Sequence, residues 1–441
     1  MQHIRRLGGM ALLLTVGLGL AACDDDDPIS PVGPDPDVEE GVLTGTLTAD
    51  RTLSADTTYL LKGVVLVEDG ATLTIEPGTL ILGDVATQPT ALVIQQGGRI
   101  DAQGTADAPI VFTSSNPAGS RARGDWGGVV LNGRSICNFP DAADCVAEGF
   151  PGSYGGDVLD DDSGIMRYVR VEFAGYEVSL GNELNAYTFN GVGSGTTLEY
   201  LQAHQGLDDG FEWFGGTVDL KYAVASGISD DSFDYSTGWQ GRGQFWIALQ
   251  DPDDADNGFE VDNNAAEDAL PRTNPSIYNV TLVGKGDTGT AGESTRGLLF
   301  RLGTAGDVGN VIVTGFEDGL DIDNASTHQQ CVEGNLVLSN SIIYGNGSDL
   351  ADDDDTFEVD CMAQPGWDTI LHDDPMLADP FNWDAPDFAP QAGSPAAVAA
   401  NAATVPGEWF TAVDYIGAVD PSAATRWYEG WTTWEKAVGQ Q

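Results

Sequence analysis

Short apolar runs, separated by Gly, Asn and Asp, recur along most of the chain. Clear examples lie at residues 64–67, 73–75, 92–94, 110–112 and 311–313. Residues that favour extended structure dominate these runs, and apolar positions do not follow the three- and four-residue spacing of an amphipathic helix. The pattern therefore predicts many short β-strands with turns between them.

The runs belong to an internal repeat. Five segments of six residues align with one another, at 208–213, 230–235, 256–261, 295–300 and 317–322. The offset is 22 residues in the first and last steps of this series and 26 in the second, where an acidic loop adds four residues. A further step of 22 residues back places Phe189 beneath Phe211.

A repeat of this length is one supersecondary unit that packs against its copies. The consensus of leucine-rich repeats is absent, and a propeller repeat needs about 40 residues or more. We therefore predict an all-β fold, a right-handed parallel β-helix with about 22 residues per coil and coils about 4.8 Å apart. Two inward columns are expected, the first of Phe211, Phe233, Phe259, Leu298 and Leu320, the second of Trp213, Tyr235, Val261, Phe300 and Ile322.

The chain is strongly acidic. Acidic residues number 69 against 18 basic ones, for a formal net charge of -51. Such a charge repels nucleic acids and anionic lipid headgroups, which excludes a nucleic-acid-binding function. Because basic residues are so few, most carboxylates lack an internal partner, and we expect dissolved or bound cations to balance them.

The repeat gathers acidic residues into neighbouring outward columns. Three successive coils contribute one amide, Asn257, and eight carboxylates, those of Asp208, Asp209, Glu212, Asp230, Asp231, Asp234, Asp256 and Glu260. Two like charges 5 Å apart repel by roughly 0.8 kcal/mol in water, and by several times that near a protein surface. Calcium accepts six to eight oxygen ligands and would remove this repulsion, so we predict a calcium site formed by these eight residues. The alternative is a solvated acidic face on a protein adapted to high salt.

The N-terminus has the features of a bacterial lipoprotein. A basic start and an apolar run lead to Leu20, Ala21, Ala22 and Cys23, so residues 1–22 are expected to be a signal peptide and Cys23 the lipidated residue. The alternative is an ordinary signal peptide with a chance cysteine. Residues 23–41 are rich in Asp and Pro and predict an extended tether. Four aspartates directly after Cys23 resemble the surface-export signal of Bacteroidetes-type lipoproteins, whereas the enterobacterial rule would retain such a protein at the inner membrane.

Four cysteines remain once Cys23 is set aside, namely Cys137, Cys145, Cys331 and Cys361. An even number in an exported protein predicts two disulfides. Pairing of Cys137 with Cys145 and of Cys331 with Cys361 is the simplest of the three possible connectivities. Each bond would stabilise the fold by about 2–4 kcal/mol.

Several motifs resemble those of a family of exported β-helix proteins with the pectate-lyase-like superfold. They lie at residues 98–110, 124–128, 161–164, 182–185, 209–216 and 414–418. The resemblance implies a β-helix, which we place at residues 42–400, and an exported address, at the outer membrane or cell surface. The family has no settled activity, so the resemblance implies no chemistry.

Residues 401–441 are expected to form a C-terminal cap segment. Trp427, Trp431 and Trp434 are spaced four and three residues apart, which would place them on one face of a short helix. A β-helix must cover its open ends to avoid stacking on its neighbours. We therefore expect this helix to cover one end of the coil.

These features favour a lipid-anchored, calcium-stabilised binding or structural protein of the cell envelope, with a polysaccharide or an envelope protein as its partner. The alternative is a surface polysaccharide lyase or hydrolase that uses the acidic calcium cluster. Arg296, with Arg242 and Arg301 as further candidates, would act as the base of a lyase. In the binding protein, Arg296 would instead pair with Asp318.

Other residues bear on an enzymatic function. Asp231 and Glu212 would be one carboxylate pair for a hydrolase. Trp126, Trp239 and Trp246 would stack on sugar rings if exposed, or would pack inside the protein. His204, His328 and His372 lie in unrelated contexts without the spacing of metal ligands.

Overall fold

The computed structural model describes residues 41–141, 145–149, 152–286, 289, 291–351 and 356–437. The predicted signal peptide, Cys23 and nearly all of the predicted tether lie outside the described residues. Among the helices within these ranges, none is long and apolar enough to cross a membrane.

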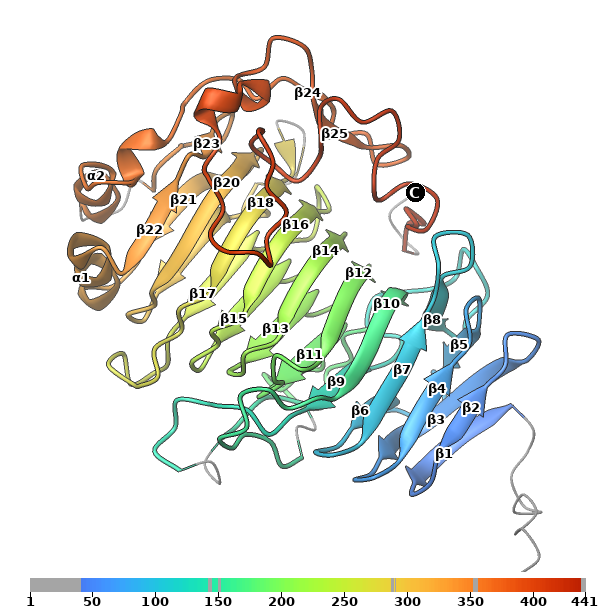
Figure 1. The fold of residues 1–441 in the computed structure, drawn as a ribbon. Coiled ribbons are helices and arrows are strands. Elements are labelled where there is room, and N and C mark those ends of the chain that lie inside the picture. Colours follow the sequence, from blue (N-terminus) through green and yellow to red (C-terminus); the bar gives the residue numbers. More distant parts are fainter. Residues whose placement is uncertain are drawn as a thin grey trace, which may run out of the picture. The chain divides into compact units, whose positions relative to one another are not determined.

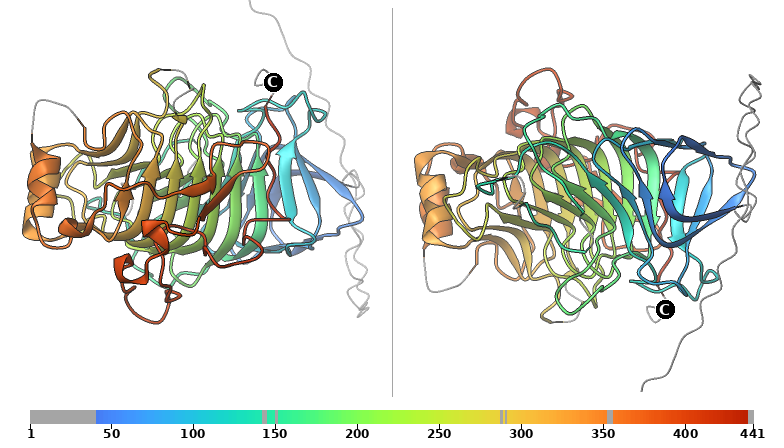
Figure 2. Two further views of the ribbon diagram at one scale, coloured as in Figure 1. Left: turned by 90° about the horizontal axis from the view of Figure 1, so that it is seen from above. Right: turned by 90° about the horizontal axis from the view of Figure 1, so that it is seen from below.

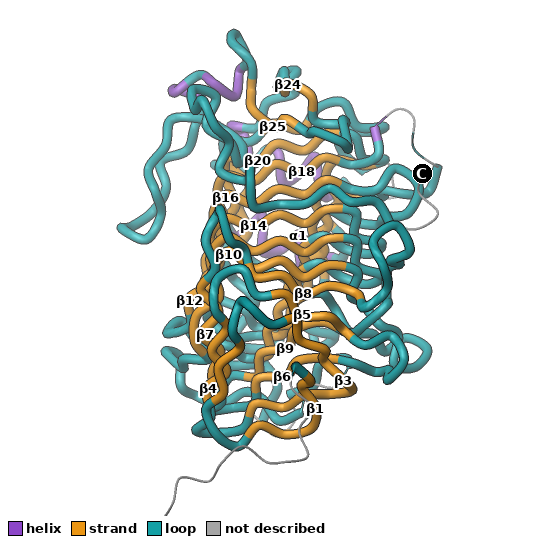
Figure 3. Tube along the Cα trace, turned by 90° about the vertical axis from the view of Figure 1, so that its right-hand side faces the viewer, coloured by secondary structure: helices purple, strands orange, loops and turns teal. Residues whose placement is uncertain are grey.

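Within the described residues, 23 strands pair in parallel as a single sheet that winds into coils (Figures 1 and 3). The fold is a right-handed parallel β-helix, as predicted. Its strands stack on three sides, which we call faces A, B and C. All three faces contain strands with regular in-register pairing between successive coils.

Face A consists of β2 (Arg51–Leu53), β4 (Thr72–Ile75), β7 (Arg99–Gln103), the first halves of β10 (Gly164–Glu172), β12 (Thr197–His204), β14 (Asp219–Ser226), β16 (Arg242–Leu249), β18 (Ser276–Val283) and β20 (Gly306–Thr314), and β22 (Leu336–Ser339). Face B consists of the first halves of β1 (Val42–Leu47) and β3 (Thr58–Val67), then β5 (Leu80–Gly83), β8 (Ile110–Ser114), the second halves of the six long strands from β10 to β20, and β23 (Ile342–Ile343). Face C consists of the second halves of β1 and β3, then β6 (Ala91–Ile94), β9 (Gly128–Asn132), β11 (Tyr187–Asn190), β13 (Phe211–Phe214), β15 (Phe233–Ser236), β17 (Phe259–Asp262), β19 (Arg296–Arg301) and β21 (Asp318–Ile322).

The six long strands bend from face A to face B at one residue with a left-handed backbone. These residues are Tyr168, Tyr200, Tyr222, Phe245, Asn279 and Asn310, with φ between 49° and 65°. Bulky residues rarely adopt this conformation. Stacking of the rings, with centroids 4.3, 4.2 and 4.9 Å apart from Tyr168 to Phe245, offsets part of the strain. We call this column the corner ladder.

The two predicted core columns are confirmed. Phe211, Phe233, Phe259, Leu298 and Leu320 occupy matching positions on successive strands of face C, and so do Trp213, Tyr235, Val261, Phe300 and Ile322. The predicted position of Phe189 is wrong, because Tyr187 pairs with Phe211 and Phe189 pairs with Trp213. That coil is two residues longer than the repeat, and a shift of two residues keeps the same side chains inward.

Both predicted disulfides are confirmed, Cys137 with Cys145 and Cys331 with Cys361. The second joins α1 (Ala325–Glu333) to α2 (Phe357–Met362). Both helices lie beside the last coils, where Figures 1 and 2 show them at the C-terminal end of the β-helix. A short 3-10 helix, η3 (Trp367–Thr369), follows them.

Residues 376–437, which we call the strap, leave the coil and run across the outer side of face B (Figure 1). The strap contains an antiparallel pair, β24 (Leu377–Asp379) and β25 (Asp387–Pro390), and two short 3-10 helices, η4 (Pro395–Ala397) and η5 (Ala399–Asn401). Its apolar side chains cover outward residues of face B, namely Val224, Ile247, Leu249, Val283, Ile312 and Ile342.

The predicted position of the C-terminal tryptophans is therefore wrong. Residues 427–434 form turns and extended chain rather than a helix. Trp431 packs edge-on against Tyr168 and Tyr200 of the corner ladder, with centroids 5.6 and 6.2 Å away. The tryptophans cover a side of the β-helix, where the corner aromatics and the apolar outer residues of face B offer them a surface to pack on.

Candidate metal centre

The acidic columns lie along face C. Glu212, Asp234 and Glu260 are the first outward residues of β13, β15 and β17 and pair in register from coil to coil. The other five predicted ligands occupy the turns just before the same strands. The repeat therefore places all eight predicted carboxylates along one line.

Carboxylate oxygens along this line approach one another closely. The structure groups them into five overlapping triads in which the oxygens lie within 4.8 Å of one another. The triads are Glu148, Glu183 and Asp208; Asp208, Asp209 and Asp230; Asp209, Glu212 and Asp234; Asp230, Asp231 and Asp256; and Asp231, Asp234 and Glu260. We call these ten residues the acidic row.

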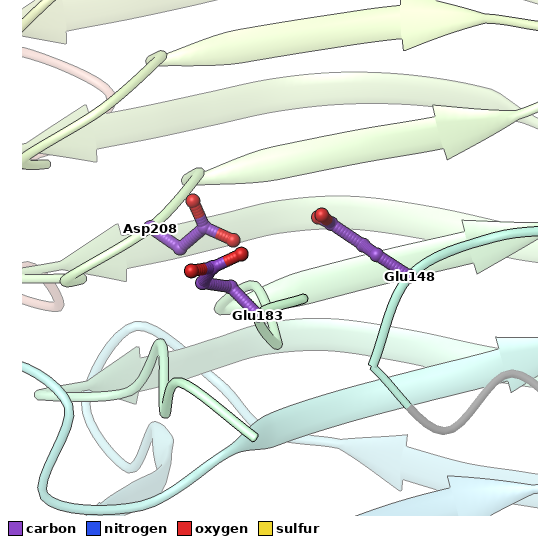
Figure 4. Close-up of side chains that lie close together, drawn as sticks. All are labelled: Glu148, Glu183 and Asp208. Atoms are coloured by element: carbon purple, nitrogen blue, oxygen red, sulfur yellow. The ribbon is translucent and has the colours of Figure 1, made fainter. Parts of the chain in front are cut away.

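Two members of the acidic row were not predicted. Figure 4 shows the carboxylates of Glu148 and Glu183 turned toward that of Asp208. Glu148 comes from the loop that follows Cys145. Glu183 directly follows a turn closed by hydrogen bonds between Ser179 and Asn182. Both lie in insertions outside the repeat, so the alignment of coils gave no signal for them.

Much of the acidic row is buried. Asp208, Asp209, Glu212 and Asp231 are only 9, 6, 5 and 4% exposed. At these positions the row differs from the solvated acidic face that was the alternative prediction, because the insertions cover it. Buried carboxylates need protons, cationic partners or metal ions to be stable.

The environment opposes ionisation of the acidic row. Burial, followed by repulsion from Glu148 and other neighbouring carboxylates, raises the pKa of Asp208 to about 9. The same two causes raise the pKa of Asp209, Glu212, Asp231 and Asp234 well above the ordinary value. Burial also raises the pKa of Glu260 to about 7 despite the nearby Arg301, and that of Asp230 to about 6.

Hydrogen bonds within the row orient some oxygens. The Asp231 amide donates to Asp209 Oδ1 over 3.0 Å, and the Asn257 amide donates to Asp231 Oδ1 over 2.8 Å. Asn185 donates to both Glu148 and Glu212. Backbone and side-chain amides thus fix one oxygen of several carboxylates and leave others directed at their acidic neighbours.

Other oxygens of the row have no partner among the described residues. Asp208 Oδ2 and Asp234 Oδ1 are buried without a hydrogen bond. The buried hydroxyl of Thr188, a residue in register with Glu212 on the neighbouring strand, also has none. A hard cation coordinates such oxygens directly. The donor set therefore fits an oxygen-preferring dication. The triads contain carboxylates alone, without the His or Cys ligands typical of zinc.

Basic residues near the row are held in ion pairs. Arg301 contacts Glu260 and Asp262. Arg296 binds Asp321 over 2.7 Å, a partner that was not predicted. It also lies in register with its predicted partner Asp318, whose charge contributes to the raised pKa of Arg296. Arg242 pairs with Asp219 on face A, away from the row.

The other residues considered for catalysis are spread over several parts of the described structure. Glu212 and Asp231 both belong to the acidic row, in different triads that share Asp234. Trp126, Trp239 and Trp246 are fully buried, so they pack inside the protein and are not available to sugar rings. The histidines are separate, with His204 against Ser226, His328 stacked on Phe357 and His372 beside Asp349.

The fold and the site together define the class of protein, a parallel β-helix with carboxylates along one outer face. Residues 45–365 match the family model of the pectate-lyase-like β-helix domain, and the chain belongs to this family. Membership of this family supports the view that the protein is a surface protein or a polysaccharide-related protein. Neither the curated proteins nor the solved structures contained a match to the chain.

Proposed function

We propose that the protein is a calcium-stabilised binding or structural protein of the bacterial cell envelope. The observation that carries this proposal is the acidic row, in which five carboxylate triads overlap along three coils. Protonation of the row costs stability near neutral pH, because the folded protein must then take up protons that the unfolded chain releases, whereas dications would balance the charge directly. Calcium suits it best because calcium tolerates variable geometry and six to eight oxygen ligands.

The position of the row suggests what calcium does there. Glu148 and Glu183 come from insertions, while Asp208 belongs to the coil. An ion bound by these three residues would tie both insertions to face C. Ions further along would link successive coils, so calcium would act as a structural ligand of the β-helix.

The arginines favour this function over that of a lyase. Burial alone would lower the pKa of Arg296, but its hydrogen bond to Asp321 and the surrounding carboxylates raise it overall. For Arg301, too, burial lowers the pKa, but the hydrogen bond and attraction to Asp262 outweigh this effect and raise the pKa overall. A base in a lyase must lose its proton, and these ion pairs hold the proton in place.

Calcium titration by calorimetry tests the proposal. The protein, first stripped of metal, is expected to bind calcium, and the variant Asp209→Asn, Asp231→Asn, Asp234→Asn is expected to lose that binding. The matched control is Asp107→Asn, Asp373→Asn, Asp414→Asn, which removes the same charge at three exposed positions. Equal binding by both variants would show that calcium only screens the general charge of the protein.

We also propose that Cys23 carries a lipid anchor. Its position after Leu20, Ala21 and Ala22 supports this. Cys23→Ser is expected to move the protein from the membrane fraction to the soluble fraction in detergent-free buffer. Retention of the variant in the membrane fraction would contradict lipid anchoring, and mass spectrometry of the wild-type N-terminus would check the modification itself.

A further inference from the structure

We infer that a cavity on face A binds a neutral sugar unit of a glycan. The cavity has a volume of about 440 Å³, within the range of about 300–1,000 Å³ typical of small-molecule sites. Its wall includes Glu199, Asp219, Lys221, Arg242, Glu408 and Trp409. The site names a ligand for the binding function proposed above, but it lies on face A and does not depend on calcium in the acidic row on face C.

The charges of the cavity are nearly balanced, unlike those of the protein as a whole. Arg242 binds Asp219 through Nε over 2.9 Å, and Arg167 of β10 binds Glu199 over 2.7 Å. Lys221 lies in register beside Glu199. Glu408 adds one more carboxylate. Lys221 and Arg242 of the wall, together with Arg167 bound to Glu199, therefore balance three carboxylates, so the cavity has little preference for a charged ligand. This distinguishes it from the acidic row, where carboxylates meet without comparable pairing.

Paired carboxylates and cations suit hydroxyl groups. A hydroxyl donates one hydrogen bond and accepts others, so it can bridge a carboxylate of Asp219 or Glu199 and a cation of Lys221 or Arg242. Hydrogen bonds to charged groups are stronger than those between neutral groups. A sugar presents several adjacent hydroxyls, which matches the alternation of acidic and basic side chains from coil to coil.

Trp409 supplies the apolar part of the wall. Its indole is half-buried, and its ring centroid lies 4.5 Å from Lys221 Nζ and 4.8 Å from Arg242 Cζ. Lys221 Nζ also donates to the Trp409 carbonyl over 2.7 Å. These contacts hold the indole before any ligand arrives, which lowers the entropic cost of binding. The C–H groups of a sugar ring would pack on its exposed surface.

The strap completes the cavity. Glu408 and Trp409 belong to the strap, whereas the other four wall residues named above belong to β12, β14 and β16. The adjoining Thr411 amide donates to Gln244 Oε1 over 2.8 Å, and Gln244 Nε2 donates to the Thr411 carbonyl over 2.8 Å. This reciprocal pair holds the strap beside the cavity.

The test is a binding screen of the full protein, by calorimetry, with neutral hexasaccharides of glucose, mannose and xylose and with hexagalacturonate. At least one neutral oligosaccharide is expected to bind, with equal affinity in calcium and in EDTA. Trp409→Ala is expected to weaken binding at least tenfold, about 1.4 kcal/mol. Glu408→Gln, a change on an exposed side chain that leaves the fold intact, is expected to weaken it several-fold.

Phe381→Ala is the matched control, because Phe381 is an aromatic residue of the strap that is 50% exposed and lines a different cavity. The Phe381→Ala variant is expected to bind the neutral oligosaccharide with the same affinity as the wild type. The inference is overturned if no neutral oligosaccharide binds at concentrations up to about 10 mM, if hexagalacturonate alone binds, or if binding is unchanged in both Trp409→Ala and Glu408→Gln. Loss of binding in EDTA alone would assign the ligand to the acidic row instead.

Discussion

Without divalent cations, the protein is expected to lose stability as the pH rises from 6.5 to 9. The carboxyls of Glu260 and Asp208, with pKa values of about 7 and 9, are raised mainly by burial and would lose their protons in this window. A raised pKa means that the folded state holds the proton more tightly than the unfolded state. The stability that each such carboxyl contributes is complete below pH 4, and it is lost as the pH rises through the pKa of the folded state.

The buried His204 sets the lower limit of the window. Burial lowers its pKa to about 3, so its effect has the opposite sign and destabilises the protein below about pH 6.5. Between pH 6.5 and 9 the acidic row dominates. The expected loss is on the order of 3 kcal/mol, measured as a fall in the urea midpoint in EDTA.

Calcium and mutation provide the controls for this pH dependence. Calcium replaces the lost protons, so millimolar calcium is expected to flatten the decline. The Asp209→Asn, Asp231→Asn, Asp234→Asn variant is expected to be less sensitive to pH than the wild type in EDTA, because three of the coupled carboxyls are gone. Constant or rising stability of the wild type over this range in EDTA would contradict the raised pKa values.

Trp431→Ala is expected to release the strap from the β-helix. Trp431 is fully buried, donates to the Trp427 carbonyl over 2.9 Å and accepts from Arg170 through its own carbonyl. Truncation of such a side chain costs about 3–5 kcal/mol. Because the strap lies outside the coil, this loss should detach the strap before it unfolds the β-helix.

Limited proteolysis measures that release. The variant is expected to be cut within residues 376–437 much faster than the wild type. Release of the strap would expose Ile247 and Ile312, which are buried beneath it, and these side chains should then promote association of the protein. Phe381→Ala, on a half-exposed side chain of the strap, should be cut at the wild-type rate. Equal cleavage of Trp431→Ala and the wild type would mean that Trp431 does not hold the strap.

The sequence predicted the parts of the fold that repeat. Inward columns such as Phe211, Phe233 and Phe259 could be aligned because each coil supplies the same side chain to the same place. The eight carboxylates followed from the same register. The alignment failed at Phe189, where the coil lengths differ, since a repeat gives no information on the length of an insertion.

Long-range contacts were harder to predict. Glu148 and Glu183 join the acidic row through insertions, and nothing in their local sequence indicates which coil they meet. The strap was missed although a signal existed. Residues 245–249 and 311–313 are apolar at every position, which indicates burial on both sides of the strands and hence a covering segment.

The most direct test of the metal centre is the melting temperature at constant ionic strength, with and without calcium. Binding to the folded state alone stabilises it by about 2.7 kcal/mol at a hundredfold excess over Kd. Millimolar calcium is therefore expected to raise the melting temperature by several degrees, and sodium at the same ionic strength is not. The Asp209→Asn, Asp231→Asn, Asp234→Asn variant should be insensitive to calcium and more stable than the wild type in EDTA. A wild-type melting temperature that calcium does not change at constant ionic strength, but that molar sodium raises, would contradict a calcium site and indicate a salt-adapted surface.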